Sequence, residues 1–258
     1  AAAGQGGAAG AAGGGSSPFF GESRCGAADV WLCEDFESGA LDSARWQAMF
    51  NLPTIDDQHA ARGGKALHVS TGATTGSGIA TKQIFPTPDE NYWGRLFVYL
   101  TALPTTPTWA HWTLVGAGPT SDSAIKGEVR VGGQLDTAIN RFGVGTDGGP
   151  TGDWTNLDAD SPEPAAVPLN TWICLEWQHD GQHDETRFFK DGVEHPSLAT
   201  TKQTDHGGNS DVPFELPTIG SIWFGFWNYN QGKPVQPDHF DVWLDEIALD
   251  GARIGCER

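Results

Sequence analysis

Arg130 and Gln134, four positions apart, have side chains suited to binding an acid group. Arginine can hold a carboxylate through two parallel hydrogen bonds, and a Gln amide can donate a further one. The segment around them is predicted to be a strand, in which alternate side chains share a face. One face then carries Lys126, Glu128, Arg130 and Gln134. This face is either the solvated surface of a sheet or one wall of a ligand cleft, in which Glu128 would orient Arg130.

A second segment, Ser221–Tyr229, is apolar and aromatic and is also predicted to be a strand. One of its faces carries two indole rings, bare backbone and a phenol, from Trp223, Gly225, Trp227 and Tyr229. The opposite face carries Phe224, Phe226 and Asn228. The first face suits a sugar chain lying across a sheet. A phenol near a cation can give or take a proton, so Tyr229 is the best candidate for a reacting group.

Composition limits the possible partners. The chain has 258 residues, 35 Gly, 11 Trp and a net charge of −18, which favours one large all-β domain. Such acidity excludes nucleic acid as a partner and disfavours long-range attraction of an anionic substrate. Salt screens this repulsion over about 10 Å, so a local basic cluster can still bind one acid group. No run of about 18 apolar residues is present, so no transmembrane segment is expected.

The chain divides into a tether and one domain. Residues 1–17 are almost entirely Ala, Gly and Ser, which is typical of a flexible tether between a secretion signal or lipid anchor and a folded domain. Residues 18–258 are predicted to form a single β-jelly-roll sandwich of two antiparallel sheets. The predicted strands span residues 29–37, 66–70, 78–85, 94–100, 111–116, 126–134, 140–144, 172–179, 186–190, 221–229 and 240–249. The long loops 146–169 and 200–217 either wall a cleft or are decoration.

Four cysteines suggest two disulfides and an oxidising, extracellular compartment. Three pairings are possible. We favour Cys25–Cys33 as a local clip and Cys174–Cys256 as a link from the C-terminus to a core strand, although the sequence alone does not decide between the pairings.

Several short motifs resemble those of known polysaccharide lyases. The run Lys126-Gly-Glu-Val-Arg130 resembles the Arg-x-Glu-(Leu/Val)-Arg strand of alginate lyases, and Phe226–Gln231 resembles their C-terminal Tyr-x-Asn-Gln strand. The overall layout is similar to that of the Cip1-like proteins, which share the concanavalin-type jelly roll with alginate and glucuronan lyases. That layout comprises Cys33-Glu-Asp-Phe-Glu-Ser-Gly, Gly63-Gly-Lys-Ala-Leu, Arg130-x-x-x-Gln134, Asn228-Tyr229 and Phe240-Asp-Val-Trp-Leu-Asp-Glu-Ile-Ala. The resemblance covers about residues 30 to 256.

The resemblance implies β-elimination at a uronic acid. Arg130 and Gln134 map to the residues that neutralise the carboxylate, and Tyr229 maps to the acid/base. The Gln-Ile-His motif of alginate lyases is absent, so His111 is chosen as the second base; the alternative is a structural hydrogen-bonding role. Asp147 is a weaker candidate.

Further residues are expected to contact the substrate. They are Lys126, Glu128, Trp112, Trp227 and Asn228, of which the two Trp rings would stack on sugars. Stacking would serve a non-catalytic carbohydrate-binding protein equally well, and this is the alternative function. A third alternative is an interaction domain displayed at the cell surface. No Glu-x-Asp-x-(x)-Glu run is present, which argues against a retaining glycosidase of this fold.

The resemblance also implies one structural Ca²⁺ ion where the first and last strands meet. Glu37, a backbone carbonyl near Gly64, and Asp245 would supply oxygen ligands, with Asp241 as an alternative to Asp245. The protein is expected to be a secreted or cell-surface monomer with no redox cofactor.

Overall fold

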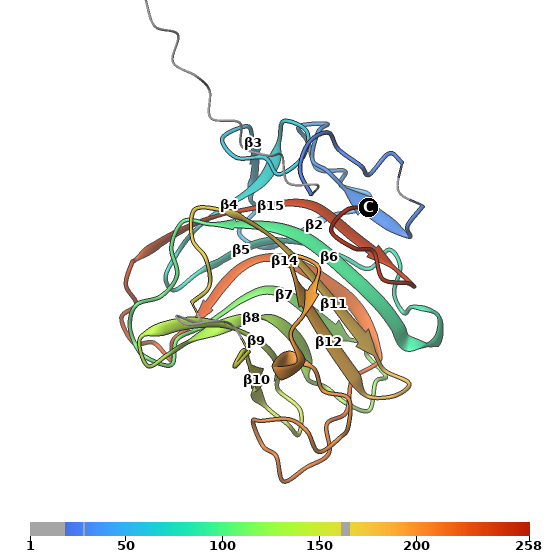
Figure 1. Ribbon diagram of the computed structural model, residues 1–258, viewed down its shortest axis with the longest axis vertical. Coiled ribbons are helices and arrows are strands. Elements are labelled where there is room, and N and C mark those ends of the chain that lie inside the picture. The colour runs from blue at the N-terminus through green and yellow to red at the C-terminus, as the bar shows by residue number, and fades with distance from the viewer. Residues whose placement is uncertain (1–18, 28, 161–165) are drawn as a thin grey trace, which may run out of the picture.

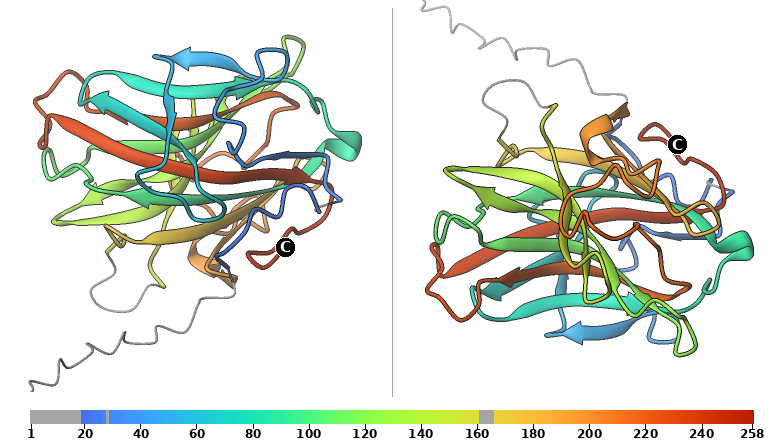
Figure 2. Two further views of the ribbon diagram at one scale, coloured as in Figure 1. Left: turned by 90° about the horizontal axis from the view of Figure 1, so that it is seen from above. Right: turned by 90° about the horizontal axis from the view of Figure 1, so that it is seen from below.

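The computed structural model describes residues 19–27, 29–160 and 166–258; the predicted tether over 1–17 lies outside these residues. Two antiparallel sheets stack face to face and bend like nested arches (Figure 1). Their strands run in nearly the same direction, as expected for aligned sheet packing (Figure 2). The predicted all-β jelly roll is confirmed. In the described part of the chain, no helix is long and apolar enough to cross a membrane.

The outer sheet contains eight strands. Its order is β13 (Val193–Glu194), β12 (Glu185–Lys190), β11 (Trp172–Asp180), β6 (Asn91–Leu100), β15 (His239–Asp250), β4 (Ala66–Gly72) and β3 (Thr54–Asp56), with β1 (Leu32–Glu34) also paired to β15. The second sheet, called the cleft sheet below, has seven strands. Its order is β10 (Asp153–Leu157), β9 (Ile139–Asp147), β8 (Glu128–Asp136), β7 (His111–Pro119), β14 (Ile219–Tyr229), β5 (Gly76–Thr81) and β2 (Gln47–Phe50).

The core lies between the sheets and follows the predicted alternation. In β8, Val129 and Val131 are fully buried while Arg130 between them is partly exposed. In β14, Phe224 and Phe226 are fully buried and face the outer sheet. Alternation therefore directs the polar and indole side chains of these strands to the other face of the cleft sheet.

Not every element was predicted. Asp191 and Gly192 form a tight two-residue turn between β12 and β13, and both have the positive φ angles, 50° and 82°, that such a turn requires. Strands β2, β3, β10 and β13 were not predicted, because they are two to five residues long and lie between turn residues. Strand β10 lies within residues 146–169, which were predicted to be a loop. That prediction was wrong for β10, and this strand contributes Trp154 to the candidate functional site.

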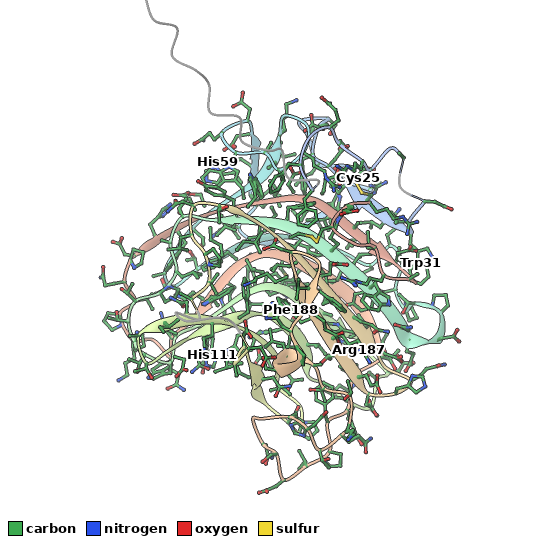
Figure 3. All side chains as sticks on the ribbon, viewed as in Figure 1. Cys25, Trp31, His59, His111, Arg187 and Phe188 are labelled. Carbon is green, nitrogen blue, oxygen red and sulfur yellow. A yellow bond between two sulfur atoms is a disulfide. The ribbon has the colours of Figure 1, made fainter. Side chains whose placement is uncertain are left out.

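Both favoured disulfides are present, Cys25–Cys33 and Cys174–Cys256. The second joins β11 to a residue 82 positions further along the chain. The side chains that surround these links fill the region above the outer sheet (Figure 3).

A buried carboxylate lies next to the disulfides. Glu246 is fully buried at a β-bulge in β15, with a φ of 44°. It accepts hydrogen bonds from Arg62 Nη1 at 2.5 Å and from Arg95 Nη2 at 3.0 Å. Both guanidinium groups lie over the Phe97 ring. This group of one carboxylate and two guanidinium groups is called the charged triad below. Burial lowers the pKa of Arg95 to about 10, against the opposing effect of Glu246.

The charged triad connects distant segments of the chain. Arg62 donates to the carbonyl oxygens of Phe19, at 2.6 Å, and of Cys256, at 2.5 Å. The amide of Arg24 donates to Glu246 as well. Both ends of the described chain are therefore bonded to the same buried charges, on the side of the outer sheet that faces away from the cleft sheet.

Glu246→Gln is expected to destabilise the fold by about 3–5 kcal/mol, because it leaves two buried guanidinium groups without their counter-charge. Denaturant unfolding measures this. The matched control is Glu194→Gln, which breaks a half-exposed pair with Arg187 and should cost about 0–1 kcal/mol. Equal effects of the two variants would contradict the role given to the triad.

A second buried polar pair joins β6 and β11. The Tyr92 hydroxyl lies 2.7 Å from His179 Nδ1, and both side chains are buried. The phenol and Nδ1 share one hydrogen bond, and a neutral imidazole carries a proton on one of its two ring nitrogens. Burial lowers the pKa of His179 to about 3.

This pair predicts a loss of stability in acid. Below pH 6.5 the unfolded chain binds a proton at His179 that the folded chain does not bind, so the free energy of unfolding falls with pH. The loss approaches about 1.4 kcal/mol per pH unit, or roughly 2–3 kcal/mol between pH 6.5 and 4.5. Denaturant unfolding across this range is the measurement. The double variant Tyr92→Phe/His179→Leu should show a shallower pH dependence, and an unchanged slope would contradict the assignment.

Candidate functional site

A pocket of about 140 Å³ opens on the cleft sheet. Its lining comes from β7, β8, β9, β10 and the end of β14, namely His111, Arg130, Gly145, Thr146, Asp147, Trp154, Tyr229 and Gln231. His111 lies on the side of the molecule opposite Cys25 (both labelled in Figure 3). The two predicted strands are thus brought together, although β7 lies between them.

Arg130 is held on three sides. Its Nε donates to Glu128 Oε1 at 2.7 Å, and its Nη2 pairs with Asp147 Oδ2 at 2.6 Å. Its guanidinium carbon lies 4.7 Å from the centre of the Trp227 ring, which is a cation–π contact. The predicted orienting role of Glu128 agrees with this geometry. Glu128 is itself anchored by the indole N–H of Trp223, at 2.9 Å.

Tyr229 and His111 lie side by side. Their Cα atoms are directly paired across β14 and β7, and their ring centres are 5.9 Å apart. Tyr229 is 39% exposed, so its phenol is accessible to a ligand in the pocket. The His111 ring also makes an edge contact with Trp154 at 5.4 Å. The neighbouring positions predicted for the phenol and the imidazole are therefore present.

Aromatic rings continue across the whole cleft sheet. Successive ring centres are 5.4 to 6.2 Å apart along the series Trp154, His111, Tyr229, Trp227 and Phe50. The series starts on β10 and ends on β2, the two edge strands of the sheet. It is called the aromatic track below.

Gln134 shares the face of Arg130 but lies in a different hollow. That neighbouring hollow is lined by Gln134, Trp154, Thr155, Asn156, Leu157, Gly207 and Gly208. The Trp154 ring lines both hollows. Its Cα is also paired directly with that of His111 across β8 and β7, so Gln134 lies beside the imidazole as well as in this hollow.

Two predicted substrate contacts are corrected by burial, and a third, Lys126, stays a prediction. Trp112 is fully buried in the core, where its indole N–H donates to Asn140 at 3.0 Å. Asn228 is 4% exposed and points to the core face of β14. Lys126 precedes β8, and its ammonium group donates to the Ser121 carbonyl. Alternation predicted correctly which face each β14 side chain occupies. In β7, the Trp112 ring lies on the core face and not on the cleft face.

The carboxylates predicted to bind Ca²⁺ accept hydrogen bonds from backbone amides. Glu37 Oε1 accepts from the amides of Gly64 and Lys65, so Gly64 presents its N–H rather than its carbonyl to Glu37. Asp245 is fully buried and accepts from the amides of Ala61 and Arg62. Ca²⁺ binding at these carboxylates stays a prediction.

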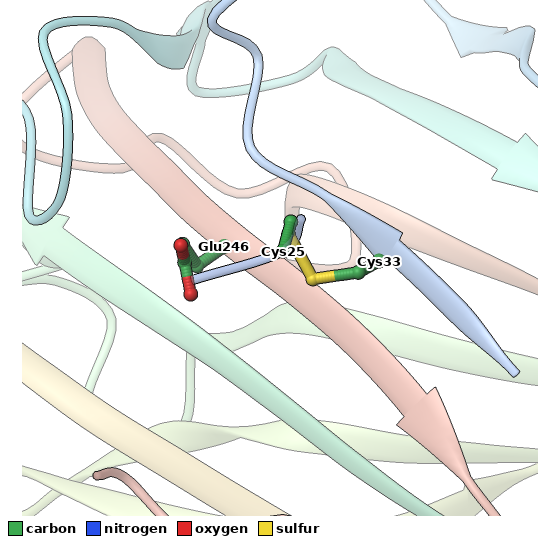
Figure 4. A group of neighbouring side chains, drawn as sticks. All are labelled: Cys25, Cys33 and Glu246. Carbon is green, nitrogen blue, oxygen red and sulfur yellow. A yellow bond between two sulfur atoms is a disulfide. The ribbon is translucent and has the colours of Figure 1, made fainter. Parts of the chain in front are cut away.

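One other group of potential metal ligands is found within the described ranges. It contains Cys25, Cys33 and Glu246 (Figure 4). Both sulfur atoms are in the disulfide, and Glu246 is bonded to the two arginines. A disulfide offers no thiolate for a metal, so this group does not fit a metal site.

Sequence reasoning missed or undervalued several residues of the pocket. Trp154 and Gln231 were not singled out, and Asp147 was given only a minor role. Asp147 could have been found from the strand pairing, because it lies directly opposite Glu128. Trp154 could not, because its strand was predicted to be a loop.

No protein-family model matches the chain, and no curated protein sequence matches it. Among solved structures, the cellulose-induced protein Cip1 is similar, with a TM-score of 0.61 and 18% identity over 87% of this chain and 99% of that one. The fold is that of Cip1. Domain 4 of AbnA, a GH43 extracellular arabinanase from Geobacillus stearothermophilus, in complex with arabinotriose, has a TM-score of 0.51 and 18% identity over 88% and 95% of the two chains.

An alginate lyase of Polysaccharide Lyase family 7, AlgAT5, aligns with a TM-score of 0.46 and 12% identity over 77% of this chain and 81% of that one, a likeness too weak to support an inference. The comparison with Cip1 confirms the predicted Cip1-like jelly roll. At these identities the likeness concerns the fold alone.

Proposed function

We propose that the protein is a secreted polysaccharide lyase that cleaves a uronic-acid-containing glycan by β-elimination. One observation carries the proposal: an arginine, a phenol and an imidazole line a single pocket on the cleft sheet. The two disulfides are compatible with an extracellular location. The protein is expected to act as a monomer.

The reaction needs three groups in one place. A base removes the proton at C5 of the uronate, and the electron pair left behind forms the C4–C5 double bond. The bond from C4 to the glycosidic oxygen breaks, and that oxygen takes a proton from an acid. The C5 proton is weakly acidic, so a cation must neutralise the adjacent carboxylate as charge develops on it.

The pocket offers a candidate for each role. Arg130 would hold the carboxylate through its Nη atoms, since its Nε is already bonded to Glu128. Tyr229 would protonate the leaving oxygen or, as a phenolate beside the cation, remove the C5 proton. His111 would take the remaining role from the neighbouring strand. Gln134, which is paired with His111 across the strands, would donate a further hydrogen bond to the sugar from the adjoining hollow.

Asp147 competes with the substrate in this mechanism. Its carboxylate lies 2.6 Å from Arg130 Nη2 and is 58% exposed. A uronate that binds Arg130 must share or displace this partner. Asp147 is therefore expected to weaken uronate binding and to restrict it to glycans whose other contacts compensate.

The carboxylates around Arg130 favour the alternative function, that of a non-catalytic protein that binds neutral sugars. Glu128 and Asp147 together exceed the single charge of Arg130, so the immediate surroundings carry a net negative charge. The aromatic track would stack on sugar rings whether or not they carry a carboxylate. The variants below separate the two functions.

Tyr229→Phe is expected to abolish formation of unsaturated uronate and to leave the fold intact, because the phenol is exposed and the ring is retained. Absorbance at the unsaturated-uronate band is followed with a panel of polyuronates and glucuronic-acid-bearing hemicelluloses. Turnover by the wild type and by the variant at equal rates would refute the role of the phenol. No turnover of any substrate, together with binding to glycans, would favour the non-catalytic alternative.

Asp147→Asn is expected to tighten uronate binding by several-fold to about tenfold at low salt, since removing one competing charge near the ligand is worth around 1 kcal/mol. Binding of uronate oligosaccharides is measured by titration calorimetry in the Tyr229→Phe background, where substrate is not consumed. The matched control, Glu194→Gln, breaks the pair with Arg187 on the outer sheet and should change nothing. Unchanged or weaker uronate binding by Asp147→Asn would contradict direct contact between Arg130 and the carboxylate.

A further inference from the structure

Phe50, at the end of β2, combines three unusual features. Its side chain is 49% exposed although it is a large apolar ring. Its backbone has a φ of +61°, in the left-handed region that bulky residues rarely adopt. Its ring lies nearly parallel to that of Trp227, with 6.2 Å between the centres and 13° between the planes.

The neighbouring strand leaves space for this ring. Gly76 of β5 lies between Phe50 and Trp227, and a Cβ at that position would come within 2.8 Å of Phe50 Cδ2 and 2.9 Å of Trp227 Cδ1. The Trp223 ring meets the Phe50 ring nearly at a right angle, with 5.6 Å between centres and 85° between planes. The ring is therefore positioned by two indole rings over bare backbone, on the cleft face of the sheet.

The left-handed backbone conformation at position 50 lowers the stability of the fold when the residue is Phe, whereas a glycine adopts it without this penalty. Such conformations persist when the surrounding structure requires them, and they cluster at binding sites. Phe50 also continues the aromatic track beyond Tyr229 and Trp227, with a ring spacing close to that of the other members. The exposed ring is thus continuous with the pocket.

We propose that Phe50 forms an additional sugar-binding subsite at the β2 end of the cleft, where the exposed part of its ring packs against a pyranose ring of the glycan and Trp227 holds it in position. The inference rests on the proposed glycan-binding role of the cleft, but not on catalysis. A glycan chain would then lie across the strands, along the aromatic track, with its reacting unit at Tyr229 and a further unit over Phe50. Stacking requires no charge on the sugar, so this subsite accepts a neutral or an acidic ring.

The test compares Phe50→Ala and Phe50→Gly with the wild type in the Tyr229→Phe background. Titration calorimetry measures the binding of glycan fragments from two to six sugar units. We expect the wild type to gain affinity with length, and both variants to lose about tenfold for the longer fragments and little for the shortest that binds. Phe50→Trp should retain the gain with length.

Thermal unfolding separates binding from stability. Glycine relieves the left-handed φ angle and alanine does not, so Phe50→Gly should melt at a higher temperature than Phe50→Ala while both lose the same affinity. Leu52→Ala is the control, because Leu52 is 63% exposed two residues away and is not a member of the aromatic track. It should bind all fragments as the wild type does.

Three outcomes would overturn the inference: equal affinities in the wild type and the Phe50 variants, an equal loss at every fragment length, or the same loss in Leu52→Ala. The wild type, which retains Tyr229, could show no lyase activity and still bind glycans with a length dependence that requires Phe50. That result would refute the proposed reaction but not the subsite. No binding of any fragment by the wild type would refute both.

Discussion

The bonds between Glu246 and the guanidinium groups of Arg62 and Arg95 are the interaction on which the rest of the architecture depends. Buried charges are stable only when they are paired and fully hydrogen-bonded. Here the remaining donors of Arg62 go to carbonyl oxygens near both ends of the described chain. The outer sheet is thereby connected to the terminal segments.

The two sheets therefore have different roles. The outer sheet carries the charged triad and is joined by both disulfides, which are structural features. The cleft sheet carries the partly exposed arginine, phenol and imidazole, and its inner face packs into the common core. A site built on strands of a packed sheet is positioned more rigidly than one built on loops. A ligand would thus meet side chains that are already in place, which lowers the entropy cost of binding.

The sequence predicted the central parts of this molecule better than its edges. Alternation along β8 and β14 placed Arg130 and Tyr229 correctly, because both strands have one face buried in the core. It did not predict β2 or β10, because strands of four or five residues between turn residues have too few positions to show a period of two. Phe50 and Trp154, the two ends of the aromatic track, lie on these strands. Gln134 was assigned to the correct face, but which hollow it enters depends on Trp154 and the 200–217 loop.

Two glycines of the cleft sheet determine how much room the aromatic rings have. Gly116 leaves space for the Trp223 indole as it reaches Glu128, since a Cβ there would lie 2.1 Å from the indole nitrogen. Gly76 does the same for Phe50 and Trp227. Neither residue has a functional group, yet a methyl group at either position would displace the rings beside Arg130. The arrangement of the rings on this surface therefore depends partly on residues that would never contact a ligand. A search restricted to chemically reactive side chains would overlook these residues.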